Sequence, residues 1–310
     1  MCIFSQPVNS VNGTKIFARS TGKGSQFLAY QMNYDSQGEN AMILPIPVRS
    51  PSNENCLRFI DLQDYEYFFY DLAKGFPYVA PSFNFTCGGG PKAVSDAAIK
   101  LHKVGSYIAS FVPTIDDFKK LDPRFTLPKK TWDLVPQYAS YGFAVFQLAS
   151  GALESHPMAF EFDSNSKSIY FPTMHIHDGE VHETEAFDHV LYMQHAGLDS
   201  KVNRYVNYDV ADESTGYIRS QEVASEFCKI AMTKQIVEPS LLVHKHIVRG
   251  DKPNRDIEIL VDGDPLTPSG NLGPYLAYLP WLIAIGSIGW FFRRRNRVRQ
   301  LQEPDANSDA

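Results

Sequence analysis

Histidines recur in the stretch from residue 175 to residue 189, which reads HIHDGEVHETEAFDH. If its first part is a strand, His175 and His177 project from the same face about 7 Å apart, because side chains alternate along a strand. Two imidazoles on one face, joined by a third histidine or a carboxylate, form the ligand set of many metal sites. With His182 and Glu183 close by, the stretch predicts a divalent-metal site formed by these four residues.

The same stretch has a second interpretation. HDGE is a good hairpin turn, and polar side chains on a solvated strand face are ordinary. The metal pattern of the cupin family places a Glu where Val181 or His182 stands here, so that pattern is absent. Glu180 and His189 lie nearby, and a second His-x-His pair occurs at His244 and His246.

Cys2 is the second candidate for chemistry. Removal of the first methionine would leave an N-terminal cysteine, whose α-amino group can act as the base for its own thiol. The start MCIF, followed by a strand and Arg19, resembles the cysteine-type N-terminal-nucleophile hydrolases. Those enzymes carry Asn or Asp near the arginine, whereas Ser20 and Thr21 stand here, and the alternative is an ordinary edge-strand cysteine.

The other cysteines give no metal or redox motif. None of Cys2, Cys56, Cys87 and Cys228 forms a CxxC pair, so disulfides and isolated thiols both stay open. The glycine-rich run CGGGPK, from residue 87 to residue 92, lacks the spacing of a phosphate-binding loop. It therefore predicts a loop without a nucleotide.

An uncharged apolar run of eighteen residues, 275–292, reads YLAYLPWLIAIGSIGWFF. As a helix it would be about 27 Å long, close to the hydrocarbon thickness of a bilayer, with aromatic residues at both ends. Arg293, Arg294 and Arg295 follow it, and they are suited to lipid headgroups. The sequence thus predicts a single membrane span, and membrane lipid as a partner.

The charges around this run also predict its orientation. Arginines follow it, while no Lys or Arg lies between Arg255 and the run, where Asp256, Glu258, Asp262 and Asp264 stand. The positive-inside rule then places the C-terminus in the cytoplasm and the large domain outside, although the N-terminus shows no signal peptide. The net charge of −6 argues against nucleic acid as a partner.

The region before the apolar run predicts an α+β domain in which strands dominate and pair mostly antiparallel. Three sequential strands are expected within residues 14–20, 25–34 and 40–48, and a helix over residues 220–234. Strands do not alternate with long helices, which excludes a Rossmann-type sheet. The predicted organisation is a domain at 1–262, a Gly/Pro linker at 263–274, the span at 275–292 and a basic, then polar, tail at 293–310.

Several of these segments, taken in order, resemble an uncharacterised bacterial membrane-anchored family. The matching segments are MILPIP (42–47), FPYVAPSFNFTCGGG (76–90), VGSYIASFVP (104–113), YASYGFAVFQLASG (138–151), MAFEF (158–162) and IYFPT (169–173), followed by the C-terminal span. The resemblance implies a domain on the outer side of the membrane and carries no activity. Three hypotheses follow: a non-enzymatic envelope binding or structural module, a metal-binding protein or metal-dependent enzyme, and an N-terminal cysteine hydrolase.

Overall fold

The computed structural model describes residues 3–49, 52–77, 108–164, 166, 168–204 and 215–266. All of them belong to one compact unit, Met1–Ser269. The predicted span at 275–292, its arginines and the nucleophile candidate Cys2 lie outside the described residues. Among the helices that the structure describes, none has the length and hydropathy needed to cross a membrane.

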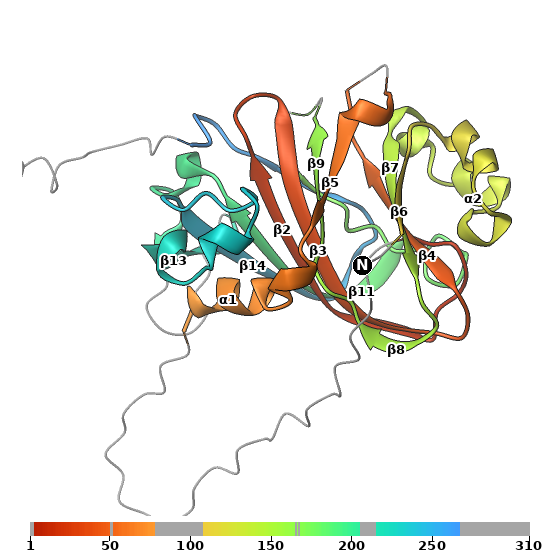
Figure 1. Cartoon of the computed structure of the whole chain (residues 1–310), viewed down its shortest axis with the longest axis horizontal. Helices are drawn as coiled ribbons and strands as arrows, with labels where there is room; N and C mark the ends of the chain where they lie inside the picture. The colour runs from red at the N-terminus through yellow and green to blue at the C-terminus, as the bar shows by residue number, and fades with distance from the viewer. Residues whose placement is uncertain are drawn as a thin grey trace, which may run out of the picture. The chain divides into compact units, whose positions relative to one another are not determined.

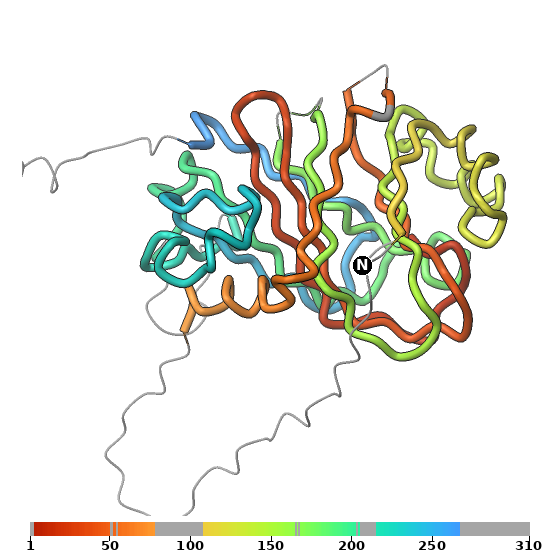
Figure 2. Tube along the Cα trace, in the orientation of Figure 1, coloured from red at the N-terminus to blue at the C-terminus, as the bar shows by residue number. Residues whose placement is uncertain are grey.

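Nine strands form the larger sheet, in the order β12-β13-β14-β11-β2-β3-β9-β5, with β8 beside β3. Their bounds are β2 Ser10–Ser20, β3 Ser25–Ser36, β5 Leu57–Asp61, β8 Gly151–Glu154, β9 Met158–Asp163, β11 Thr184–Gln194, β12 Asn203–Arg204, β13 Tyr217–Val223 and β14 Leu242–Pro253. The pairs are antiparallel except β11 with β2 and β12 with β13. The consecutive strands β2 and β3 form a long hairpin (Figure 2).

A second sheet has four strands in the order β1-β4-β7-β6, and a separate antiparallel pair joins β10 to β15. Their bounds are β1 Ile3–Phe4, β4 Asn40–Ile46, β6 Ala109–Val112, β7 Gly142–Leu148, β10 Ser168–Phe171 and β15 Ile257–Leu260. The third of the three expected sequential strands, β4, therefore does not continue the β2–β3 hairpin. All seven residues of β4 are buried, so both of its faces need cover, which a place in the second sheet provides.

Helices are few and short in the part of the chain that the structure describes. The α-helices are α1 Phe68–Lys74 and α2 Lys129–Asp133, and the 3-10 turns are η1 Glu54–Cys56, η2 Gln63–Tyr65, η3 Ile115–Lys120, η4 Pro123–Phe125, η5 Pro136–Ser140, η6 Ala196–Leu198, η7 Ala224–Glu226 and η8 Ile230–Met232. The helix expected over residues 220–234 is wrong, because β13 runs to Val223 and only η7 and η8 follow. Ser220 explains part of this, since its hydroxyl donates to the Glu222 carbonyl and accepts from the Val243 N–H of β14.

Three apolar cores order these elements into layers. The largest core lies between the two sheets and includes Leu28, Met42 and Phe160. A second covers the other face of the larger sheet with α1, and a third covers the other face of the smaller sheet with α2 and η3 to η5. Figure 1 shows α1 near β13 and β14, and α2 beside β6 and β7. The described domain is thus strand-dominated and mostly antiparallel, as the sequence predicts.

Candidate metal centre

The segment between β10 and β11, residues 172–183, carries the predicted histidines between two supports. On one side it runs beside β1, where the Phe4 N–H donates to the Ile176 carbonyl at 3.0 Å. On the other side the Asn254 side chain accepts from the His175 N–H at 2.7 Å and donates to the His175 carbonyl at 2.9 Å. The backbone around His175 is therefore fixed from both sides.

His175, His177 and Glu185 form the centre of the site. Each offers one ligand atom, and the three atoms lie within 4.8 Å of one another. His175 is fully buried, and its Nδ1 lies 4.0 Å from Glu185 Oε2. Neither His175 Nδ1 nor His177 Nε2 has a hydrogen-bond partner among the described residues. Buried polar nitrogens without partners are rare in proteins and call for an explanation, such as an ion that they bind.

Strand β11 supplies the carboxylate and a third imidazole. Side chains alternate along a strand, so Glu185, Phe187 and His189 share one face of β11. The Phe187 ring packs against His175 at a centroid distance of 4.4 Å and against His189 at 4.8 Å. His189 Nε2 lies 3.4 Å from His175 Nε2. One face of β11 thus presents the Glu185 carboxylate as an oxygen ligand and the His189 ring as a polar contact of His175.

Burial keeps the imidazoles neutral. It lowers the pKa of His175 far below its ordinary value, and the neighbouring His189 and His177 lower this pKa further. The pKa of His189 falls well below the ordinary range for the same main reason, and that of His177 falls to about 4. Only a neutral imidazole offers a lone pair to a metal, so these side chains do not need to lose a proton at neutral pH.

A partly buried carboxylate holds the start of the same segment. Asp256 Oδ1 accepts from the backbone N–H groups of Thr173 at 2.8 Å and Met174 at 3.0 Å. Its Oδ2 lies 2.6 Å from the Tyr138 hydroxyl and 2.7 Å from the Tyr170 hydroxyl. Burial raises the pKa of Asp256, while these four contacts oppose the rise. Asp256 positions the histidine segment and is not a ligand.

The other two predicted ligands lie apart from this group. The exposed His182 ring pairs with Asp178, at 2.9 Å from its Oδ2. The Glu183 side chain is exposed, at the point where the segment enters β11. In the second His-x-His pair, His244 Nε2 lies 3.2 Å from Asp199 Oδ1, and His246 Nδ1 contacts the Gly216 carbonyl.

The sequence reasoning missed Glu185, although a signal for it was present. The run from Glu185 to His189 alternates between a carboxylate, an aromatic ring and an imidazole at every second position. The run AFDHVLYMQH, residues 186–195, predicts a strand from Ala186, one residue after Glu185, while β11 begins at Thr184. Extending it toward the N-terminus would have placed Glu185 on the same face as His189.

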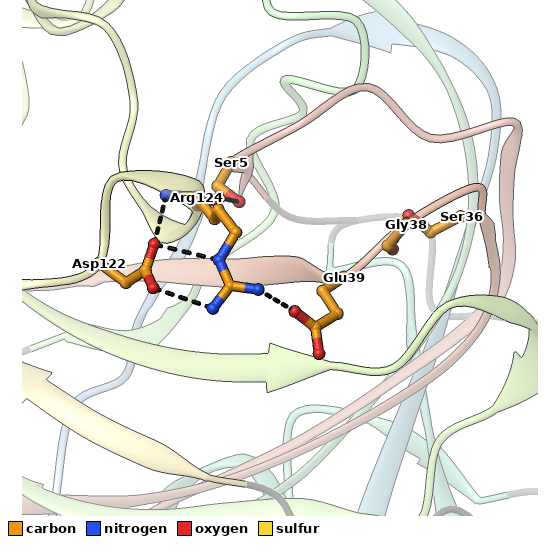
Figure 3. A network of polar contacts seen from close by, with 6 residues as sticks. All are labelled: Ser5, Ser36, Gly38, Glu39, Asp122 and Arg124. Carbon is orange, nitrogen blue, oxygen red and sulfur yellow. Dashed lines mark hydrogen bonds and ion pairs between the residues drawn. The ribbon is translucent and has the colours of Figure 1, made fainter.

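A second polar network, around Arg124, offers no such site. The guanidinium contacts Asp122 on one side and Glu39 on the other, and these side chains are exposed (Figure 3). Ser5 donates to the Arg124 carbonyl at 2.9 Å, which ties the end of β1 to η4. Exposed ion pairs contribute little to stability, roughly 0–1 kcal/mol each. The network therefore fastens loops together and leaves no ligand atom buried and unpartnered.

Comparisons with known proteins add no function. No family model and no curated protein matches the chain, so the resemblance to a bacterial family stays a prediction. The chain is similar to the crystal structure of baculovirus P35, with a TM-score of 0.46 and 14% identity over 84% of this chain and 100% of that chain. P35 in its complex with caspase-8 matches with a TM-score of 0.38 and 11% identity, over 83% and 97% of the chains. The caspase contact belongs to P35, and at such TM-scores the likeness carries no inference for this chain.

Proposed function

We propose that this domain binds one divalent metal ion, zinc in the first instance, through His175, His177 and Glu185. The observation that carries the proposal is the pair of ring nitrogens, His175 Nδ1 and His177 Nε2, which lie near a carboxylate without hydrogen-bond partners of their own in the described structure. An orphaned buried polar atom costs about 1–3 kcal/mol. A metal ion would replace this cost with two coordinate bonds.

The types of ligand support zinc over calcium or magnesium. Calcium and magnesium take oxygen ligands, whereas two imidazoles and a carboxylate suit zinc. A tetrahedral zinc ion with bonds of about 2.0–2.1 Å needs ligand atoms about 3.3 Å apart. The three atoms lie within 4.8 Å, so the side chains must close by about 1.5 Å at most. Small rotations of His177 and Glu185, both less buried than His175, would provide this movement.

Three protein ligands leave the fourth zinc position open to water. This arrangement is typical of zinc sites that do chemistry, while purely structural sites use four protein ligands. A metal-binding module of the envelope and a metal-dependent enzyme both fit the arrangement. We favour the binding module, held at the membrane by residues 275–292, because the uncharged apolar run there predicts an anchor.

The test is zinc binding by the full chain, purified without chelator. Metal content by mass spectrometry and titration calorimetry with Zn²⁺ should give one ion per chain. The double variant His175→Ala/His177→Ala should bind none, while His182→Ala should bind as the wild type does. His182 is the matched control because it lies in the same segment, is exposed and pairs with Asp178. Absence of stoichiometric zinc in the wild type, with the fold intact by circular dichroism, would refute the proposal.

A further inference from the structure

The two ring nitrogens of His175 face different groups. Nδ1 lies 4.0 Å from Glu185 Oε2, and Nε2 lies 3.4 Å from His189 Nε2. A neutral imidazole carries one proton, on one nitrogen or the other. If Nδ1 binds the metal ion as proposed above, it must be unprotonated. The proton of His175 then lies on Nε2 and points to His189.

A proton on Nε2 of His175 determines the tautomer of His189 as well. Its Nε2 must accept the proton from His175, so the proton of His189 lies on Nδ1. Nδ1 lies 3.8 Å from Asp188 Oδ1, a distance at which a negative charge attracts an N–H without a direct hydrogen bond. The other carboxylate oxygen of Asp188 accepts from the Gly13 N–H at 2.6 Å, which fastens Asp188 to β2. A chain of polar contacts thus runs from Asp188 through His189 to His175.

The packing around the two rings suits this chain of contacts. The planes of His175 and His189 differ by 9°, which is compatible with an N–H in one ring plane meeting a lone pair of the other ring. Both side chains are fully buried, and Phe187 packs against both rings.

We propose that His189 is a positioning residue of the metal site. Resting on the zinc site proposed above, it fixes the Nε2–H tautomer of His175 and so presents Nδ1 to the metal, with Asp188 as its outer partner. Histidines that bind metals commonly donate their second N–H to such a partner, and loss of the partner costs about 10–100-fold in metal affinity. The partner here is another imidazole.

Two substitutions of one residue test the proposal by Zn²⁺ titration of the full chain. His189→Leu removes the acceptor and should weaken zinc binding by about 10–100-fold. His189→Gln keeps an acceptor oxygen at a similar reach and should recover most of that loss. Asp188→Asn, which retains an acceptor for Gly13, should cause a smaller loss than His189→Leu. Thermal unfolding of each metal-free variant reports whether the fold has survived.

Nitrogen-15 spectra of the histidine rings provide a readout that a merely structural role would not affect. In the zinc-loaded wild type, we expect His175 to carry its proton on Nε2 with zinc on Nδ1, and His189 to carry its proton on Nδ1. Zinc on Nε2 of His175, or on His189 itself, would overturn the positioning role while leaving zinc binding intact. Equal zinc affinities of wild type and His189→Leu would do the same. A wild type that binds no zinc would overturn the zinc site and, with it, this inference.

Discussion

Two neighbouring parts of the segment 172–183 differ in whether their polar atoms have hydrogen-bond partners. At Thr173 and Met174 the Asp256 carboxylate receives two backbone N–H groups, and two tyrosine hydroxyls meet its second oxygen. One residue further, His175 has a fully buried side chain whose Nδ1 has no hydrogen-bond partner among the described residues. The same chain thus places a satisfied polar cluster directly beside an unsatisfied one.

The difference distinguishes residues that hold the segment in place from the histidines that we propose bind a metal ion. A satisfied polar cluster specifies one conformation and leaves no capacity to bind anything else. An unsatisfied one is costly by itself, and it persists because the surrounding structure holds it. Asp256 and Asn254 provide that support here, since they bond the backbone on either side of His175. Breaking each cluster in turn should therefore give different results.

The largest effect is expected from Asp256→Ala. It removes the acceptor of two buried N–H groups, at about 1–3 kcal/mol each, so the free energy of unfolding should fall by about 4 kcal/mol. The tyrosine hydroxyls lose less, because the Pro45 carbonyl and the Met174 sulfur lie 3.0 and 3.1 Å from them. Urea denaturation followed by circular dichroism measures the change.

Asp256→Asn is the matched control for this prediction. Its amide oxygen can accept both backbone N–H groups, and its NH₂ can donate to the tyrosine oxygens. We expect a loss of about 1 kcal/mol, within the range of a single hydrogen bond. If alanine and asparagine cost the same, Asp256 acts through its charge, and the description of a satisfied cluster is wrong.

Asn254→Ala comes next in size. Three hydrogen bonds disappear, to the His175 N–H, to its carbonyl and to the His182 carbonyl at 3.0 Å. Because Asn254 is only partly buried, water can replace some of them, and we expect a loss of about 2 kcal/mol in the free energy of unfolding. Zinc binding should weaken as well, because the ligand-bearing backbone is released.

Asn9→Ala is the comparison for this variant. Asn9 is exposed and donates to Asp35 at 3.1 Å, so its loss should cost no more than about 0.5 kcal/mol and leave zinc binding unchanged. Equal behaviour of the two variants in urea denaturation and zinc titration would show that Asn254 does not support the site.

A third buried histidine, His195, has a hydrogen-bond partner, as the polar atoms around Asp256 do. It makes the stability of the fold depend on pH. Its Nδ1 accepts from the Gly197 N–H at 3.1 Å, and burial lowers its pKa to about 4, with His244 and Lys201 lowering it and Asp199 and Asp264 opposing. The unfolded chain takes up a proton near pH 6.5 and the folded chain does not. Stability is therefore complete above pH 6.5 and is lost as the pH falls toward 4, by about 1.4 kcal/mol at pH 5.5.

His195→Asn isolates this contribution. Asparagine keeps a side-chain acceptor for the turn η6 and does not titrate. The difference in unfolding free energy between pH 8 and pH 5.5, measured in the presence of a chelator, should be about 1.4 kcal/mol smaller in the variant. An unchanged difference would mean that His195 is accessible to protons in the folded chain.

How much of this the sequence could predict depends on the range of the interactions. The alternating strands predicted the fold class, and the spacing of His175 and His177 predicted two ligands on one side of the chain. Glu185 and His189 join them only because β11 lies against the segment, and the supports come from Asn254 and Asp256, more than 70 residues away. Those contacts depend on which strands pair, and local sequence patterns do not contain that information. The place of β4 in the second sheet is another example.

The smallest effect is expected at Glu183, which the sequence predicts as a ligand and the structure leaves exposed. Glu183→Ala should change zinc affinity by less than about twofold and stability by no more than about 0.5 kcal/mol, as for other surface substitutions. Glu185→Ala is its pair, two residues along the chain, and should lower zinc affinity at least about tenfold, as the loss of a direct ligand must cost no less than the loss of an outer partner. Zinc titration of the two variants measures both. The reverse result would place the metal at the end of the segment, near His182, and would make the buried pair of His175 and His189 a packing feature of the core.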